Sequence, residues 1–309
     1  MRVLISGASG LIGTELVRQL GEAGHTVVRL VRHPATGPDE VTWNPAVFEI
    51  DPAALDGIDA VVNLSGASLA RLPWTSSYRT EILASRTHAT RTLVEAIRKT
   101  PTPPAVLLSG SAVGVYADRP GEILTERSAP GEDFLAAVVE AWEAEALRTP
   151  APTRVVLLRT GLVIARGGAL KPLLPLVRLG LGGPLGHGTQ HWPWISLHDE
   201  ATAIVHLLDS SLSGPVNLVG PTPATANDVI RAVTVALHRP FFLPVPEFAL
   251  TFALRDAARQ LLLADQRVSS SLLEADGFRF EQRTVAEAVD AMLAQPSGRP
   301  IGRARHPSP

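Results

Sequence analysis

The sequence has no cysteine among its 309 residues. Disulfide bonds, thiolate zinc sites, thiol nucleophiles and Cys-x-x-Cys redox pairs are therefore excluded, and the absence fits a reducing compartment. Tyrosine is also scarce, since only Tyr78 and Tyr116 are present. Any chemistry that needs a phenol hydroxyl must use one of these two side chains.

Excess charge of one sign and long apolar runs are lacking too. The formal net charge is -2 at pH 7, so no surplus of basic residues is available to bind nucleic acid or an anionic membrane. No apolar run approaches the roughly 20 residues that span a bilayer. The run between Arg2 and Gly7 is too short for a secretion signal. With 45% hydrophobic residues the chain can form a large core, and we expect a globular, cytoplasmic protein with no nucleic-acid or membrane partner.

A glycine-rich turn near the N-terminus carries the strongest pattern. Residues 2–6 (RVLIS) read as a buried strand, the turn GASGLIG follows, and TELVRQLGEAGH has the apolar spacing of a helix that ends at Gly24. A second strand, TVVRLVR, comes next, so the glycines lie within a complete strand-helix-strand unit. Such a unit binds the diphosphate of a dinucleotide at the turn and at the helix N-terminus. The residues expected to contact the dinucleotide are Gly7, Ser9, Gly10, Leu11, Ile12 and Gly13.

The end of the second strand indicates which dinucleotide is bound. Sites for NAD place an acidic residue there to bind the ribose 2′-hydroxyl, whereas sites for NADP need a cation for the 2′-phosphate. The chain reads LVRHP at this point, and no acidic residue occurs between the strand and Asp39. We therefore predict NADP(H) as the cofactor, with Arg32 bound to its 2′-phosphate.

Strands and helices alternate along the next part of the chain. Apolar strand patterns that run into turns occupy 59–68, 105–116 and 153–165, and helical patterns occupy 87–100 and 134–148. This repetition predicts an α/β fold of the NAD(P)-binding Rossmann type, a doubly wound parallel sheet with ligands at the C-terminal ends of its strands. The residues predicted to lie at such ends are Asn63, Gly66, Ala67 and Thr160 as cofactor contacts and Ser111 as a catalytic candidate.

Composition changes after residue 165. Glycine, proline and tryptophan gather over about 165–200, which suits a lobe of loops and short helices over a small-molecule substrate. We expect Gln190, Trp192 and Trp194 to contact that substrate. Three histidines in this region have spacings that match no metal-binding pattern, so we predict no metal site. They are His187, His191 and His198.

Regular structure resumes at 194–209, where Asp199 and Glu200 are expected in the first turn of a helix, as carboxylates that favour its dipole. A short strand, a helix from Asn227 and mostly helical sequence up to about Leu293 follow. The last residues are small, proline-rich and basic, which predicts a disordered tail. We divide the chain into a Rossmann domain with its substrate lobe, a C-terminal helical module and the tail. Their ranges are 1–245, 246–295 and 296–309.

The chain resembles a known family over about residues 1–295. The motifs that carry the resemblance include, in order, GASGLIG, VVNLSGAS, SRTHATRTLVEAI, SGSAVGVY, LRTGLVIARGGAL, WPWISLHDEATAI and GPVNLVGPTPAT. Together they are similar to the SulA-like epimerase family, a branch of the extended short-chain dehydrogenases. The resemblance implies NADP(H) binding through the glycine turn and Arg32, and a small C-terminal helical module. It implies no particular substrate, because family members are described only as nucleoside-diphosphate-sugar epimerases or oxidoreductases.

The catalytic pair of the short-chain dehydrogenases is missing. That chemistry uses a tyrosine for proton transfer, a lysine four residues later, and a serine or threonine that polarises the substrate oxygen. Phe134 and Val138 stand where the tyrosine and lysine are expected, and neither side chain can transfer a proton or carry a charge. Ser111 and Tyr116 remain as catalytic candidates.

Three functions are compatible with these residues. The first is an NADP-dependent oxidoreductase or nucleotide-sugar epimerase in which another group transfers protons. The groups considered are Tyr116, Glu126, His187 and His191, whereas Trp142 and Glu143 are interpreted as packing and surface residues. The second is a non-enzymatic NADP(H) sensor or regulator, which the missing pair favours. The third is a cell-division-inhibitor-like interaction protein. A homodimer is compatible with the resemblance, and the sequence does not decide between enzyme and sensor.

Overall fold

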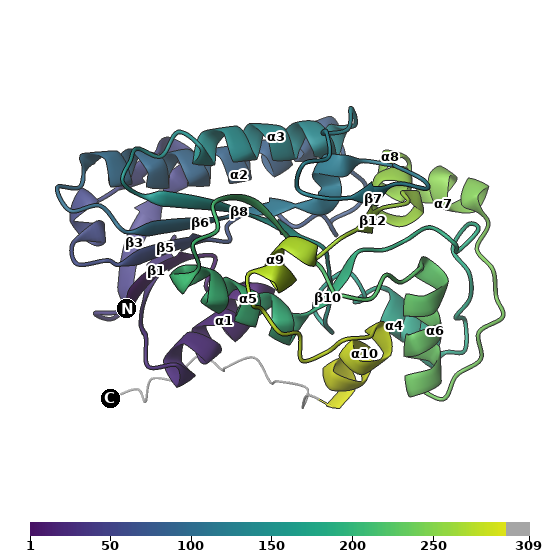
Figure 1. Ribbon diagram of the computed structural model, residues 1–309. Coiled ribbons are helices and arrows are strands. Elements are labelled where there is room, and N and C mark those ends of the chain that lie inside the picture. Colours follow the sequence, from purple (N-terminus) through teal and green to yellow (C-terminus); the bar gives the residue numbers. More distant parts are fainter. Residues whose placement is uncertain (295–309) are drawn as a thin grey trace, which may run out of the picture.

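The computed structural model describes residues 1–294 and is built around an eight-stranded sheet (Figure 1). The strand order is β11-β8-β6-β5-β1-β2-β3-β4, and all neighbours are parallel except β3 and β4. The chain winds outward in both directions from β1, which confirms the predicted doubly wound α/β sheet. The strands are β1 (Arg2–Ser6), β2 (Thr26–Val31), β3 (Glu40–Asn44), β4 (Glu49–Ile50), β5 (Ala60–Asn63), β6 (Val106–Ala112), β8 (Arg154–Thr160) and β11 (Gly214–Leu218).

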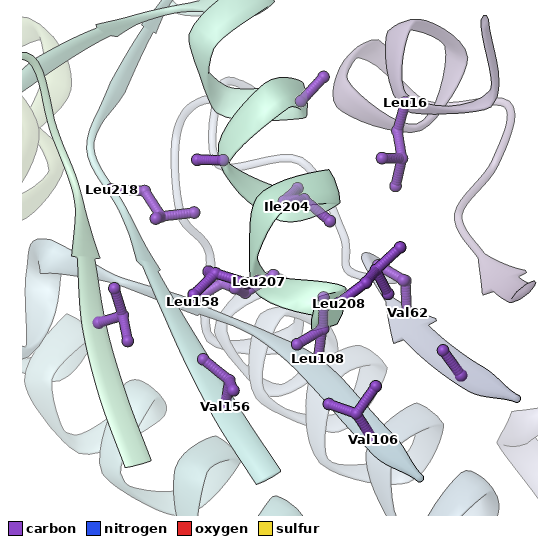
Figure 2. Close-up of a cluster of buried hydrophobic side chains, with 14 of the residues drawn as sticks. Leu16, Val62, Val106, Leu108, Val156, Leu158, Ile204, Leu207, Leu208 and Leu218 are labelled. Atoms are coloured by element: carbon purple, nitrogen blue, oxygen red, sulfur yellow. The ribbon is translucent and has the colours of Figure 1, made fainter. Parts of the chain in front are cut away.

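Helices α1 (Leu11–Glu22) and α5 (Leu197–Asp209) cover one face of the sheet. Figure 2 shows Leu16 of α1 and Ile204 of α5 directed toward the apolar side chains of the central strands, among them Val62, Leu108 and Leu158. All five side chains are fully buried. Burial of one such side chain contributes about 1.5–3 kcal/mol, so this layer fixes α1 and α5 against the sheet.

Helices α2 (Ser76–Lys99) and α3 (Phe134–Ala146) cover the opposite face (Figure 1). Side chains alternate along a strand, so Leu4 and Val61 point to this face and pack with Leu93 and Ile97 of α2. Strands that are apolar on both faces are typical of parallel sheets covered by helices. The apolar strand patterns in the sequence therefore predicted this layering correctly.

Helix α2 is longer than its sequence pattern suggested. It begins at Ser76 rather than at Thr87, because the Thr75 hydroxyl accepts a hydrogen bond from the N–H of Tyr78 and caps the first turn. The added turns bury Tyr78 and Ile82 against α3. Residues 76–86 are rich in polar side chains, so only the packing against α3 reveals this part of the helix.

The residues after β8 form a second cluster of elements beside the sheet. Two short strands pair there, and one apolar core joins them to helices from both the predicted substrate lobe and the C-terminal part. These elements are β9 (Leu162–Ile164), β10 (Trp194–Ser196), α4 (Leu173–Arg178), α6 (Ala226–Ala236) and α10 (Val285–Ala294). The remaining elements are β7 (Ile123–Leu124), α7 (Glu247–Leu254), α8 (Asp256–Ala258), β12 (Arg267–Val268), α9 (Ser271–Ala275), a π-helical turn at Arg259–Leu263, and 3-10 helices at Pro45–Val47, Pro52–Leu55 and Val113–Tyr116.

Within residues 1–294, no helix combines the length and the apolar character needed to cross a bilayer. The predicted disordered tail at 296–309 lies outside the described residues.

Candidate functional site

The glycine turn between β1 and α1 is too tight for side chains. Gly7 has a φ of 76°, in the left-handed region, and a Cβ on Gly13 would lie 2.2 Å from the Gly7 carbonyl oxygen. Gly10 is the N-cap of α1, and no side chain caps the helix or places an acid in its first turn. The first N–H groups of α1 therefore remain available to an anion at the positive end of the helix dipole. Ser9, Gly10 and Leu11 are exposed at this turn.

Arg32 follows the last residue of β2 and is exposed. It forms no ion pair with any residue in the described part of the chain, whereas its neighbour Arg29 pairs with Asp39 at 3.2 Å. Of these two arginines, Arg32 is thus the one whose charge is available to a phosphate.

The loop after β5 lies against the glycine turn. A Cβ on Gly7 would be 2.8 Å from the carbonyl carbon of Leu64, so the two segments touch. Asn63 is fully buried: its Oδ1 accepts a hydrogen bond from the Ser6 hydroxyl at 2.6 Å, and its Nδ2 donates to the Thr90 hydroxyl at 2.9 Å. Asn63 therefore holds the ends of β1 and β5 to α2, and it acts on a ligand through the loop that it positions.

Gly66 and Ala67 continue this loop beyond the C-terminal end of β5. Gly66 is exposed, and the N–H of Ala67 donates to the Ser85 hydroxyl of α2 at 2.9 Å. A Cβ on Gly66 would lie 3.1 Å from Cζ of Arg86, so the arginine side chain packs directly on this glycine. Sequence reasoning did not single out Arg86. The available signal was its spacing, since it follows the buried residues of α2 at intervals of four along the same helix face.

The two positions that lack the tyrosine and lysine lie in an apolar cluster. Val138 is 3% exposed and packs against Tyr78 and Ile82 of α2. Phe134 packs on the same cluster, with its ring centroid 5.8 Å from that of Trp74. Neither Phe134 nor Val138 has a proton to give or accept, so neither can take the role of the missing tyrosine or lysine.

A buried polar network lies beneath the ends of β6, β8 and β11. The Ser111 hydroxyl donates to Oε1 of Glu143 at 2.5 Å, and Arg159 donates through Nε and Nη2 to both oxygens of that carboxylate, each at 2.9 Å. Nη1 of Arg159 also donates to the Tyr116 hydroxyl at 3.0 Å, which in turn donates to Oδ1 of Asn217 at 2.7 Å. Burial lowers the pKa of Arg159, but the hydrogen bonds and charge interactions with Glu143 and Tyr116 together outweigh burial and raise the pKa overall. Arg159 is therefore permanently charged.

The interpretation of Glu143 as a surface residue is wrong. Its side chain lies on the face of α3 that is turned toward the sheet, and the residue is 8% exposed. Trp142 is a packing residue, as expected: its ring contacts the backbone of Gly110, and its Nε1 donates to the Thr90 hydroxyl at 2.9 Å. A glutamate that stays ionised on a buried helix face needs a cation, and for Glu143 that cation, Arg159, comes from a distant strand.

The network limits what the two catalytic candidates can do. Tyr116 is fully buried, and burial raises its pKa above the ordinary value, whereas proton transfer at neutral pH needs a lower one. Ser111 is 5% exposed, and its proton is directed to Glu143, which leaves the hydroxyl oxygen as an acceptor. We therefore assign no proton transfer to Tyr116.

Of the other proton-transfer candidates, Glu126 adjoins this network, and its carbonyl oxygen accepts a hydrogen bond from Nη1 of Arg159 at 3.3 Å. Oε1 of Glu126 accepts the N–H of Asn217 at 2.9 Å, and Nδ1 of His191 lies 2.8 Å from Oδ1 of Asp265. His187 is exposed. His198 pairs with Glu281 at 2.7 Å, and the described residues contain no group of three side chains arranged to hold a metal ion.

Thr160, at the end of β8, is bonded to a buried carboxyl group. Its hydroxyl donates to Oε1 of Glu200 at 2.7 Å, while Oε2 of Glu200 has no partner in the described residues. Burial raises the pKa of Glu200 to about 8, so the group is mostly protonated at neutral pH. Its position in the first turn of α5 confirms the prediction, but its expected role as a charge near the helix dipole is wrong, because a neutral acid carries none.

The predicted substrate contacts lie inside the lobe. Nε2 of Gln190 and Nε1 of Trp192 both donate to the carbonyl oxygen of Leu262, and Trp194 is 1% exposed. The cavity beside the two tryptophans measures about 10 Å³, room for one water at most. This cavity, which is lined by Trp192 and Trp194 but not by Gln190, is too small for a substrate.

A larger cavity, of about 160 Å³, lies between the start of α2 and the segment that joins α7 to α8. Arg79 lines it, pairs with Asp256 at 2.9 Å and lies 4.4 Å from the ring centroid of Phe134. Sequence reasoning missed this cavity because its two walls are far apart in the chain. Because Arg79 lines the cavity and also contacts Phe134 of the first turn of α3, the cavity is a candidate substrate position.

Comparisons with known proteins agree with this architecture. A model of the NAD dependent epimerase/dehydratase family matches residues 3–220, and a domain of unknown function, DUF1731, matches 245–292. An epimerase family protein of Mycobacterium bovis is 39% identical over 297 residues, which cover 95% of this chain and 98% of the relative. The crystal structure of human epimerase family protein SDR39U1 with NADPH has a TM-score of 0.86 and 34% identity, and covers 94% of this chain and 99% of that one. The structure of a nucleoside-diphosphate sugar epimerase from Corynebacterium glutamicum has a TM-score of 0.78 and 32% identity, and covers 95% of this chain and 58% of that one.

Proposed function

Since the chain belongs to the NAD dependent epimerase/dehydratase family, we propose that it binds NADP(H) and acts as an oxidoreductase or nucleotide-sugar epimerase without a Tyr-Lys pair. One observation carries the cofactor assignment: the uncapped N-terminus of α1 lies beside the glycine turn, and the unpaired Arg32 follows the adjacent strand. The human relative was crystallised with NADPH, which supports the same assignment.

Each part of this site has a defined task in the proposal. The N–H groups of the glycine turn and α1 bind the diphosphate, because no side chain competes for them. Arg32 binds the 2′-phosphate. The nicotinamide, when bound, supplies hydride transfer. Ser111 accepts a hydrogen bond from a substrate hydroxyl, since its own proton is held by Glu143.

Replacement of Arg32 by alanine is expected to weaken NADPH binding about 10- to 100-fold and to leave NADH binding nearly unchanged. The reason is that only NADPH carries the 2′-phosphate that the guanidinium binds. Isothermal titration calorimetry with both nucleotides measures the change. The matched control is Arg29→Ala, which removes an arginine already paired with Asp39 and should preserve the preference. The assignment fails if the wild-type protein binds neither form of NADP, or if Arg32→Ala keeps the preference for NADPH.

A non-enzymatic NADP(H) sensor is the second candidate function. The apolar cluster around Phe134 and Val138 favours it, because it removes the usual acid and base. Oxidation of NADPH in the presence of nucleotide sugars, quinones and small carbonyl compounds separates the two functions. Turnover that falls in Ser111→Ala would support the enzyme, whereas tight NADPH binding without turnover on any of these compounds would support the sensor.

A further inference from the structure

Arg86 is a partly buried cation that has no acidic partner among residues 1–294. It lies on the side of α2 that faces α3, and its guanidinium is 5.2 Å from the ring centroid of Trp142. Within residues 1–294 its one hydrogen bond runs from Nη1 to the carbonyl oxygen of Ile82, at 3.0 Å, and it forms no ion pair. Burial lowers the pKa of Arg86 to about 10, which still leaves the group charged at neutral pH.

Such an arrangement is unfavourable unless something else compensates the charge. Removing a guanidinium from water costs free energy, and proteins offset that cost with a carboxylate or another anion. The buried Arg159 has Glu143 for this purpose, and the more exposed Arg79 and Arg98 of α2 pair with acidic residues. Arg86 therefore has the surroundings of a residue that binds an anionic ligand.

The neighbours of Arg86 place it on the path of the cofactor. Its guanidinium packs on Gly66, whose loop touches the glycine turn through Leu64. On its other side, the Trp142 ring contacts Gly110 of β6. Arg86 thus lies between the ends of β5 and β6, the direction in which a dinucleotide extends when its diphosphate rests at β1.

The region around Arg86 also lacks the lysine that short-chain dehydrogenases use as a cation. Val138 stands at the position of the missing lysine, and Trp142, which Arg86 covers, is one helical turn further along α3. We propose that Arg86 supplies the missing positive charge from the neighbouring helix and binds the nicotinamide half of NADP(H). Its contacts there are the phosphate group attached to the nicotinamide ribose and the oxygens of that ribose. This inference rests on the proposed function, because it requires that NADP(H) is bound.

Two ligands test the proposal by calorimetry: NADPH and adenosine 2′,5′-bisphosphate. The bisphosphate keeps the adenosine half of NADPH but lacks the nicotinamide ribose and the phosphate attached to it. Arg86→Met is expected to weaken NADPH binding about 10- to 100-fold and to change binding of the bisphosphate less than about twofold. Arg86→Lys, which keeps the charge, should retain part of the affinity for NADPH. The control is Arg91→Met, an exposed arginine on the same helix that lies over Phe48, and it should alter neither affinity.

The outcomes separate this proposal from the proposed function. Unchanged NADPH binding in Arg86→Met overturns the role of Arg86 while the proposed function stands. Equal weakening of both ligands, or a lower melting temperature of the free protein, would mean that Arg86 supports the fold or the adenosine half, and this also overturns the proposal. A wild-type protein that binds neither ligand would contradict the proposed function itself, and the role of Arg86 with it.

Discussion

Replacing Arg159 by methionine is expected to lower the free energy of unfolding by about 3–5 kcal/mol. The substitution leaves the Glu143 carboxylate buried without its two hydrogen bonds from the guanidinium, and it also removes a donor to the Tyr116 hydroxyl. An unpaired charge in this position has no access to water, because Glu143 is 8% exposed. Urea denaturation at neutral pH measures the loss.

A more exposed ion pair at the C-terminal end of α3 provides the control. Glu145 pairs with Arg148 at 3.2 Å, and Arg148→Met should change the free energy of unfolding by less than about 1 kcal/mol. The double variant Glu143→Leu with Arg159→Met removes both charges and should recover most of the loss. Similar effects of Arg159→Met and Arg148→Met would show that the buried pair does not stabilise the fold in the way described.

Glu200→Gln is expected to stabilise the protein increasingly as the pH rises from about 4.5 to about 8. Burial raises the pKa of Glu200 to about 8 from an ordinary value of 4.5. The folded protein therefore keeps a proton that the unfolded chain releases within this range, so wild-type stability is complete below the lower value and is lost as the pH rises through the upper one. The slope is about 1.4 kcal/mol per pH unit, which amounts to about 5 kcal/mol over the range.

Glutamine suits this test because it is neutral at every pH and can still accept the hydrogen bond of the Thr160 hydroxyl. Chemical denaturation at several pH values should show stability curves of wild type and Glu200→Gln that diverge toward alkaline pH. Glu140→Gln, an exposed residue of α3, should run parallel to wild type. Parallel curves for Glu200→Gln as well would mean that the carboxyl group of Glu200 is ionised in the folded protein.

Much of the fold could be predicted because its signals are local. The strands β1, β5, β6 and β8 are apolar on both faces, and such runs are typical of a parallel sheet whichever helices cover them. The start of α2 at Ser76 was missed because its signal is not local. The apolar residues of its first turns are buried only by packing against α3, which comes later in the chain.

In the candidate site, too, the features that could be predicted are those formed by residues close together in the sequence. Gly7, Gly10 and Gly13 lie within seven consecutive residues of the sequence, so their pattern contains the whole geometry of the phosphate turn. The sequence alone favoured Arg32, and the structure adds that Arg29 is paired with Asp39.

By itself, the amino-acid sequence determined the sheet, the glycine turn, the arginine after β2 and the absence of a Tyr-Lys pair, because each depends on residues adjacent in the chain. Only the tertiary structure decided which buried charges are compensated. In the part of the chain that the structure describes, Glu143 pairs with Arg159, Glu200 stays protonated beside Thr160, and Arg86 has no acidic partner. Helical periodicity shows which face of a helix is buried, but the partner that this face meets comes from a distant segment, and that partner sets the charge and the chemistry.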